Sequence, residues 1–216
     1  MSIFSTILTI AVIVLAIHFI KTNKSQPKEK YNYVVWFDRT SDAVDGVLNF
    51  LYKLQSDKDL CSFIESQKGA TLRINGKTIT SSHEKLKHLF LMDVAKCYAT
   101  MDYSPAGSDR RSIPMFLFYS RLNDPSVSIT IDTLPTYKEK CQDSFDRIMG
   151  QLSNSVKKST DIYFVAEYLK HYNKELLSEY VKTLLKFGYA VAGAKGKVSK
   201  KDGKALDRIF NYLGEI

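Results

Sequence analysis

Apolar residues form two patterns along the chain, an uninterrupted run at the start and one-sided stripes afterwards. The run, IFSTILTIAVIVLAIHFI at residues 3–20, contains no Asp, Glu, Lys or Arg. A helix of about 18 apolar residues is long enough to cross the hydrocarbon core of a bilayer. The pattern predicts a single N-terminal transmembrane helix, with residues 1–20 as a membrane anchor. A cleaved signal peptide is disfavoured, because no positive charge precedes the run and no small-residue cleavage site follows it.

The flanks of the run predict its orientation. No basic residue precedes it, and four lysines follow it: Lys21, Lys24, Lys28 and Lys30. Positively charged flanks stay on the cytoplasmic side of a membrane. We therefore expect a single-pass protein of the bacterial inner (plasma) membrane whose C-terminal domain is cytoplasmic. Residues 21–30 would form a basic tether, followed by a helical domain over residues 31–216.

Beyond the tether, apolar residues recur every three or four positions, as in helices with one buried face. This spacing predicts helices over 40–55, 58–67, 83–101, 109–122, 136–152, 160–172, 174–194 and 200–214. The stretch YNYVVWF at residues 31–37 fits either a short strand or the opening of a helix. The predicted fold class is mainly α, a transmembrane helix followed by a compact all-α domain.

One short stretch departs from the helical pattern. In ATLRINGKTIT, residues 70–80, Leu72 and Ile74 alternate with Arg73, and Asn75-Gly76 is a two-residue turn signal. We expect a small β-hairpin. Because an isolated two-stranded ribbon is marginally stable, it should pack on the helices or pair with YVVWF.

Several side chains are placed to begin helices. Ser56 with Asp59, and Ser81 with Glu84, have the spacing of a capping box. Pro114 is compatible with its helix only in the first turn.

The closing segment, AVAGAKGKVSKKDGKALDRIF, predicts two helices joined by a tight loop. Gly188 would permit close approach of a neighbouring helix, and Gly196 would end the first helix in a left-handed conformation. Ser199 would begin the second helix, with Asp202 three residues later. The joint is accounted for by structural chemistry alone.

Residues 180–214 also resemble the helix–loop–helix of TerB-like domains, found in tellurite-resistance proteins and membrane-anchored co-chaperones. The matching positions are Ala194, Gly196, Val198, Ser199 and Leu206. The resemblance implies an all-α fold of paired helices and a membrane-proximal stress or defence context. The family has candidate metal-ligating acids in this loop. Because Lys195 stands where the family has its Asp, no metal site is expected here.

Charge and cysteine content indicate the class of partner and the cellular compartment. The 216 residues carry a formal net charge of +8, which favours anionic partners. Three cysteines, Cys61, Cys97 and Cys141, lie far apart and suggest no disulfide framework. Cys61 and Cys97 fall in apolar helical stripes, so we expect both to be buried thiols in a reducing compartment.

Candidate chemistry is sparse. The sequence has no phosphate-binding glycine loop, metalloprotease motif, nucleophile elbow or C-x-x-C pair, so no catalytic residue, metal ligand or cofactor is expected. Asp93 is an unusual acid on an apolar helix face. It should be a capped or exposed carboxylate, since a buried functional acid would need a partner. Arg110-Arg111 mark one basic position. The main basic cluster, a solvated surface or a contact for anionic lipid or nucleic acid, comprises Lys195, Lys197, Lys200, Lys201 and Lys204.

Two functions are compatible with these features. The first is a non-enzymatic, membrane-anchored adaptor or scaffold whose helical domain binds a protein partner in a bacterial stress or defence system. The second is an oligomeric effector that permeabilises the membrane in antiviral defence, in which Thr6 and Thr9 would help anchor helices associate. A hydrolase or nuclease is disfavoured.

Overall fold

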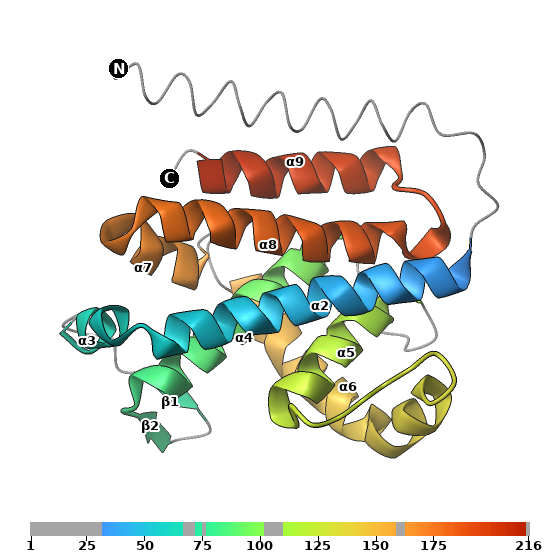
Figure 1. Ribbon diagram of the computed structural model, residues 1–216, viewed down its shortest axis with the longest axis horizontal. Helices are drawn as coiled ribbons and strands as arrows, with labels where there is room; N and C mark the ends of the chain where they lie inside the picture. Colours follow the sequence, from blue (N-terminus) through green and yellow to red (C-terminus); the bar gives the residue numbers. More distant parts are fainter. Residues whose placement is uncertain (1–31, 67–71, 75–76, 102–109, 159–162, 215–216) are drawn as a thin grey trace. The chain divides into compact units, whose positions relative to one another are not determined.

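A computed structural model describes residues 32–66, 72–74, 77–101, 110–158 and 163–214 (Figure 1). Within them the chain forms eight α-helices, one short 3-10 helix and one two-stranded sheet. In chain order the elements are α2 (Tyr33–Ser56), α3 (Lys58–Ser66), β1 (Leu72–Ile74), β2 (Lys77–Ile79), α4 (Ser82–Thr100), α5 (Ser112–Asn123), α6 (Leu134–Lys158), α7 (Phe164–Tyr172), α8 (Lys174–Ala192), η1 (Gly193–Lys195) and α9 (Lys200–Gly214).

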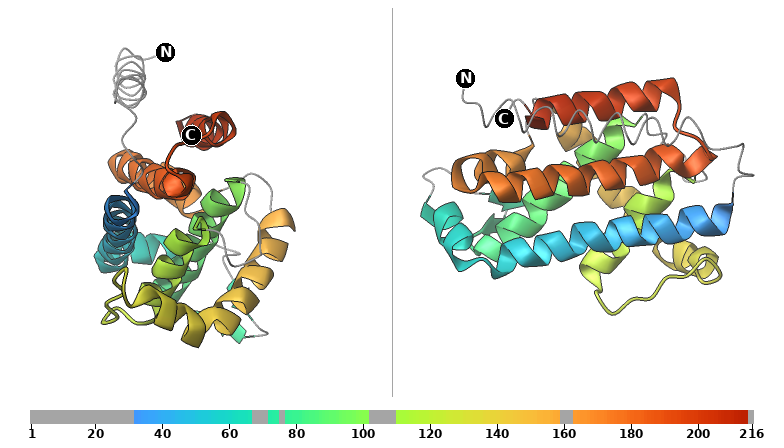
Figure 2. Two further views of the ribbon diagram at one scale, coloured as in Figure 1. Left: turned by 90° about the vertical axis from the view of Figure 1, so that its right-hand side faces the viewer. Right: turned by 45° about the horizontal axis from the view of Figure 1, so that its top comes forward.

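Helix α8 is the centre of the helical unit, which spans Tyr33–Ile216. It contacts α2, α4, α5, α7 and α9 (Figures 1 and 2). Its sequence explains this position, because one broad apolar stripe of the helix is buried against several neighbours: Leu177, Tyr180, Val181, Leu184, Phe187, Gly188, Val191 and Ala192. The predicted all-α character of the domain is confirmed.

The stretch YVVWF is helical and not a strand. It forms the first turns of α2, and its buried residues Trp36 and Phe37 continue the apolar stripe of that helix. The indole Nε1–H of Trp36 donates a hydrogen bond to the backbone oxygen of Ala190 in α8, at 3.0 Å. This bond joins the start of α2 to the last turn of α8, and it satisfies one carbonyl near the helix end.

The predicted hairpin is confirmed. Strands β1 and β2 are antiparallel, with Leu72 opposite Ile79 and Arg73 opposite Thr78. The sheet has only these two strands in the described residues, so the hairpin does not pair with YVVWF. The turn at Asn75-Gly76 lies outside the described residues.

The sequence predicts the first residues of the helices better than the side chains that cap them. Helix α3 begins at Lys58 as expected, but the predicted capping box of Ser56 with Asp59 is wrong. Asp57 Oδ1 accepts a hydrogen bond from the Leu60 N–H at 2.9 Å, while the Ser56 hydroxyl donates back to the Tyr52 carbonyl. Helix α4 does start after Ser81, although that side chain makes no capping bond. Pro114 is the third residue of α5, within the first turn as predicted.

The predicted fold class needs correction in its membrane-spanning part. Among the described residues, no helix combines the length and the apolar character needed to cross a bilayer. The longest, α2 and α6, carry charged residues along their outer faces, so that each buries only one side. The stretch 3–20 on which the prediction rested, and the tether at 21–30, lie outside the described residues. The fold described here is therefore a helical domain with a hairpin.

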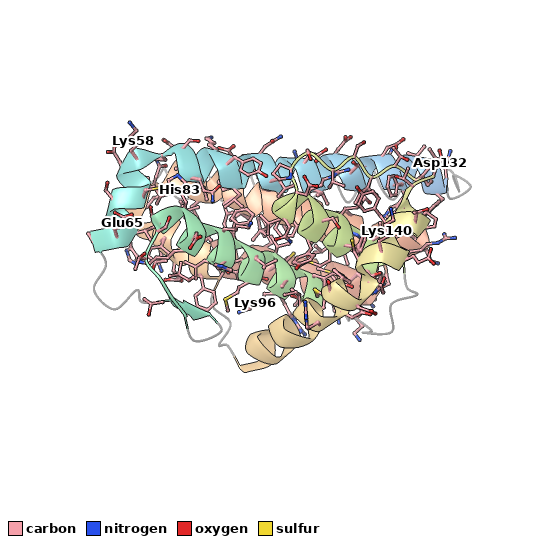
Figure 3. The ribbon with its side chains drawn as sticks, turned by 90° about the horizontal axis from the view of Figure 1, so that it is seen from below. Lys58, Glu65, His83, Lys96, Asp132 and Lys140 are labelled. Carbon is pink, nitrogen blue, oxygen red and sulfur yellow. The ribbon has the colours of Figure 1, made fainter. Side chains whose placement is uncertain are left out.

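Charged side chains lie on the outside of this domain. Figure 3 labels Lys58 and Glu65 of α3 and Lys140 of α6, all of them exposed. Aromatic residues fill the interior; the rings of Phe50, Phe90 and Tyr180 pack together with centroids 5.4–6.4 Å apart. Two aspartates are exceptions to this division, because they are buried.

Candidate functional site

The turn between α8 and α9 is the first candidate. Helix α8 ends at Ala192 and tightens into η1, after which Gly196 adopts φ 91° and ψ −20°. The Gly196 N–H donates to the carbonyl of Gly193 at 2.8 Å. The predicted left-handed glycine is confirmed, and a residue with a Cβ would be strained there.

The predicted capping box at Ser199 is confirmed as well. The Ser199 hydroxyl accepts a hydrogen bond from the Asp202 N–H at 3.1 Å, and Asp202 Oδ2 accepts from the Ser199 N–H at 3.2 Å. Each side chain thus satisfies a backbone donor at the start of α9.

The carboxylate of Asp202 also faces inward. Its side chain is 2% exposed, and Oδ2 lies 2.8 Å from Nη2 of Arg111, whose side chain is 12% exposed. The other guanidinium nitrogen, Nη1, donates to the carbonyl of Met101 at 2.7 Å. Arg111 is therefore part of the interior and not of a basic surface. Sequence reasoning missed this pair, because its members are 91 residues apart and no local pattern links them.

Close packing holds α9 against α8. A Cβ added at Gly188 would lie 2.7 Å from Leu206 Cδ2 and 3.4 Å from Cys97 Sγ. The predicted close approach at Gly188 is confirmed, and α9 is the helix that makes it.

The lysines of this turn remain at the surface. Lys197, Lys200, Lys201 and Lys204 are exposed. Lys195 lies in η1, and its side chain is outside the described residues. Four of the five predicted residues are therefore brought to one end of the domain, where the turn joins α9 (Figure 1). Because Asp202, the acid between them in sequence, is bound to Arg111 inside, their positive charge faces solvent.

Asp93 in α4 is the second candidate, and the structure corrects one of its two expected states. It is 0% exposed, so the exposed alternative is wrong. Its oxygens accept hydrogen bonds from the backbone N–H groups of Phe164 and Val165, each at 2.8 Å, and from the Tyr180 hydroxyl at 2.6 Å. Asp93 is thus a capping carboxylate, but the helix that it caps is α7. Nothing in the local sequence indicated Tyr180 as its partner.

The surroundings of Asp93 shift its protonation. Burial raises the pKa of this carboxyl from 3.8 to about 7, although its three donors and the charge of Lys96 act in the opposite direction. Burial and the nearby Asp93 also raise the pKa of Tyr180 well above its ordinary value. All three groups that bond to Asp93 are neutral donors. These three bonds join α4, α7 and α8, and the charge of Lys96 acts on Asp93 in addition to them.

The cysteines behave as buried packing residues. Cys61 and Cys97 are 8% and 0% exposed, which confirms the prediction for both. Burial and the neighbouring Asp93 raise the pKa of Cys97 to about 12, so this thiol is not ionised near neutral pH. Within the described residues, no three His, Cys, Asp or Glu side chains are grouped to hold a metal ion.

Comparison with known proteins adds no relative to this picture: no family model, no curated protein and no solved structure matches the chain. The resemblance of residues 180–214 to TerB-like domains is therefore untested and stays a prediction. The candidate site is defined by this chain's own geometry, a basic turn built on a buried Arg111–Asp202 pair.

Proposed function

We propose that this helical domain is a non-enzymatic adaptor that binds a protein partner through the lysines of the α8–α9 turn. The proposal rests on one observation: the acidic side chain of this turn is buried, whereas its lysines are exposed. Its acid, Asp202, is buried against Arg111, while Lys197, Lys200 and Lys204 are exposed beside it. The expected partner is a protein that presents an acidic surface.

The construction of the turn supports a binding role. A left-handed Gly196, the Ser199 cap and the Gly188–Leu206 contact fix the backbone that carries the lysines. A fixed backbone lowers the entropy lost when charged side chains meet a partner. The resemblance to TerB-like domains supports a stress or defence setting for such an adaptor.

The test is binding of labelled poly-L-glutamate to the full-length protein. We expect the triple variant Lys197→Ser, Lys200→Ser, Lys204→Ser to bind about 10-fold more weakly at low salt, since each surface charge contributes on the order of 0.5 kcal/mol. The difference should shrink at high salt because exposed charges are screened.

The matched control removes three exposed lysines elsewhere, in α6 and α8: Lys140, Lys182 and Lys186. Both triple variants lose the same net charge. Equal weakening by the two would mean that total charge, and not the turn, attracts the probe, and the proposal would be wrong. If the turn binds single-stranded RNA or anionic vesicles more tightly than poly-L-glutamate, the partner is nucleic acid or lipid, and the proposal of a protein partner is wrong.

The membrane-permeabilising alternative and a location at the inner membrane both depend on residues 3–20. Those residues lie outside the described part of the chain, so neither forms part of this proposal.

A further inference from the structure

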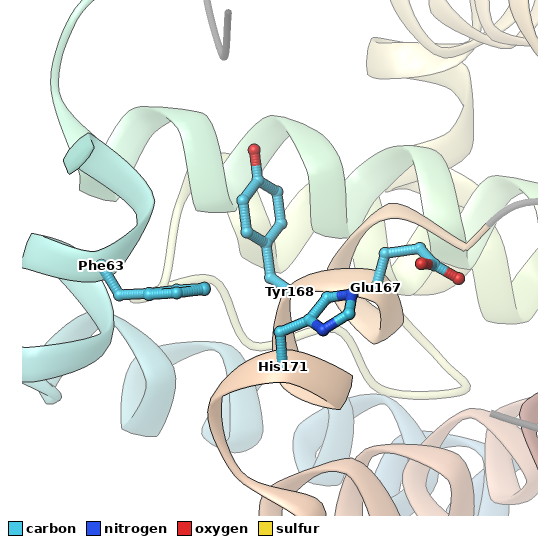
Figure 4. Close-up of a pocket in the computed structure, with 4 residues that line it drawn as sticks. All are labelled: Phe63, Glu167, Tyr168 and His171. Carbon is cyan, nitrogen blue, oxygen red and sulfur yellow. The ribbon is translucent and has the colours of Figure 1, made fainter. Parts of the chain in front are cut away.

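An open hollow lies between α3 and α7, at the opposite end of α8 from the lysine turn (Figures 1 and 4). It has a volume of about 440 Å³ and is lined by Phe63, Glu167, Tyr168 and His171. Its volume falls in the range of sites that bind small molecules or side chains. The turn proposed above as the adaptor surface does not include it.

Aromatic rings form the walls of this hollow. The Phe63 and Tyr168 rings stand at 90° to each other with centroids 6.5 Å apart. The Tyr172 ring also packs on Phe63, with centroids 5.8 Å apart. Figure 4 shows the Phe63 ring directed toward the Tyr168 ring, with His171 below Tyr168 and the Glu167 carboxylate on the far side of His171. Phe63 and Tyr168 are half-buried, so part of each ring remains open to a ligand.

The local charge is opposite to that of the whole chain. Residues 57–66 and 164–172, which include α3 and α7, contain four carboxylates and two lysines, whereas the chain as a whole carries +8. Partial desolvation, followed by the Asp57 hydrogen bond and the nearby charges of Asp57 and Asp59, raises the pKa of Tyr172 to about 12. Only the smaller contributions, from the charges of Asp57 and Asp59, reflect the acidic residues at this end of the domain.

The two walls are joined by one carboxylate. Asp57 Oδ1 accepts from the Leu60 N–H at the start of α3 and from the Tyr172 hydroxyl at the end of α7, both at 2.9 Å. Helices α3 and α7 are thus joined by bonds outside the hollow, so the site exists before any ligand arrives.

Electron-rich ring faces in a locally acidic site attract organic cations. Quaternary and alkylated ammonium groups bind to the faces of aromatic rings because the ring quadrupole is negative there, and a carboxylate nearby adds to the attraction. Simple apolar ligands would gain nothing from the charge. We propose that the α3–α7 hollow binds an alkylammonium group, with Phe63 and Tyr168 as the ring walls and Glu167 as the acidic wall.

The test compares choline with 3,3-dimethyl-1-butanol, which has the same shape without the charge. Backbone amide shifts of Phe63, Tyr168 and His171 are followed in NMR titrations of the full-length protein. We expect choline to bind about 5- to 30-fold more tightly than the neutral alcohol. Equal affinities, or no shift with choline, would overturn the proposal. Because the protein as a whole is positively charged, non-specific electrostatic attraction cannot explain binding of choline, which is a cation.

Two variants assign the walls. Phe63→Leu keeps an apolar side chain and removes the ring, so choline should lose several-fold in affinity while the alcohol changes less. Glu167→Gln keeps the shape and should weaken choline about twofold. Glu139→Gln, an exposed position on α6, is the charge-matched control and should have no effect. A choline affinity that survives both wall variants would contradict the assignment.

The alkylammonium group could belong to a free solute or to a lipid headgroup, and phosphatidylcholine vesicles distinguish these sources. Sedimentation of the protein with vesicles, reversed by free choline, would identify the headgroup. Binding of free choline without sedimentation would identify the solute. In either case the failure of poly-L-glutamate binding at the lysine turn would leave this site unaffected, because the two sites use different residues.

Discussion

Among the residues that the structure describes, two aspartates, Asp93 and Asp202, are buried, and each stabilises the start of a helix. Asp202 caps the helix to which it belongs and is paired with a cation, Arg111. Asp93 caps α7 from α4, and its bonded partners are two backbone N–H groups and the Tyr180 hydroxyl. The same side chain at the same kind of position is thus bonded to a cation in one case and to neutral donors in the other.

The difference shows what compensation does to a buried carboxylate. Neutral hydrogen bonds lower the cost of burying Asp93 but do not remove it, since the pKa of that carboxyl stays near 7. A buried ion pair instead depends on both members, because loss of one leaves an uncompensated charge. We therefore expect the junction at Asp93 to depend on pH, and the junction at Asp202 to depend on the presence of its partner Arg111.

The largest expected effect is the pH dependence caused by Asp93. Its pKa is about 7 in the folded protein and 3.8 ordinarily, so the unfolded chain releases this proton first. The stabilisation is complete below about pH 4 and is lost as the pH rises to about 7, by on the order of 4 kcal/mol at 1.36 kcal/mol per pH unit. Urea unfolding across this range measures the loss.

Asp93→Asn provides the comparison for that measurement. It cannot ionise, and its single acceptor oxygen costs stability by an amount that does not depend on pH. Only the slope matters here: between about pH 4 and pH 7 the free energy of unfolding of the variant should fall less than that of the wild type. Parallel pH profiles would show that Asp93 does not titrate in this range.

The next effect is expected at the other junction. Arg111→Met should reduce the free energy of unfolding by about 3 kcal/mol, because Asp202 is left buried without its cation. A double-mutant cycle with Asp202→Asn, measured by urea unfolding, separates the pair from general disruption. Asp202→Asn should cost less in the Arg111→Met background than in the wild type; additive effects would contradict a coupled pair.

Removing one neutral donor should have a smaller effect. Tyr180→Phe deletes the hydroxyl that donates to Asp93 and should reduce stability by about 1 to 2 kcal/mol. Because that bond lowers the pKa of Asp93, its loss should raise the pKa further and make the variant weaker at neutral than at acidic pH. The same loss at both pH values would mean that the hydroxyl does not favour the ionised form.

The smallest expected effect is that of a local cap. Ser199→Ala removes the acceptor of the Asp202 N–H and should cost about 1 kcal/mol. Thermal unfolding beside Ser199→Thr, which keeps a hydroxyl, gives the control. If the two variants unfold at the same temperature, the loss of stability does not come from the capping bond.

The two aspartates also show how far the fold could be predicted. Ser199, Asp202 and Gly196 were identified because their partners lie within a few residues, and so was the hairpin. The partners of Asp93 lie 71 to 87 residues away, and Arg111 lies 91 residues from Asp202. Such pairs depend on how helices pack, which periodicity does not specify. For the same reason, the lysine turn was predicted, whereas the hollow between α3 and α7 was not.

The hydrogen bond between Trp36 and Ala190 has a practical consequence. Trp36 is the only tryptophan of the chain and is 8% exposed. Its fluorescence is therefore a native optical reporter placed where the first turns of α2 meet the last turn of α8. Separation of these two helices would expose the indole to water and shift its emission, so unfolding of the wild type and of every variant above can be followed without an added label.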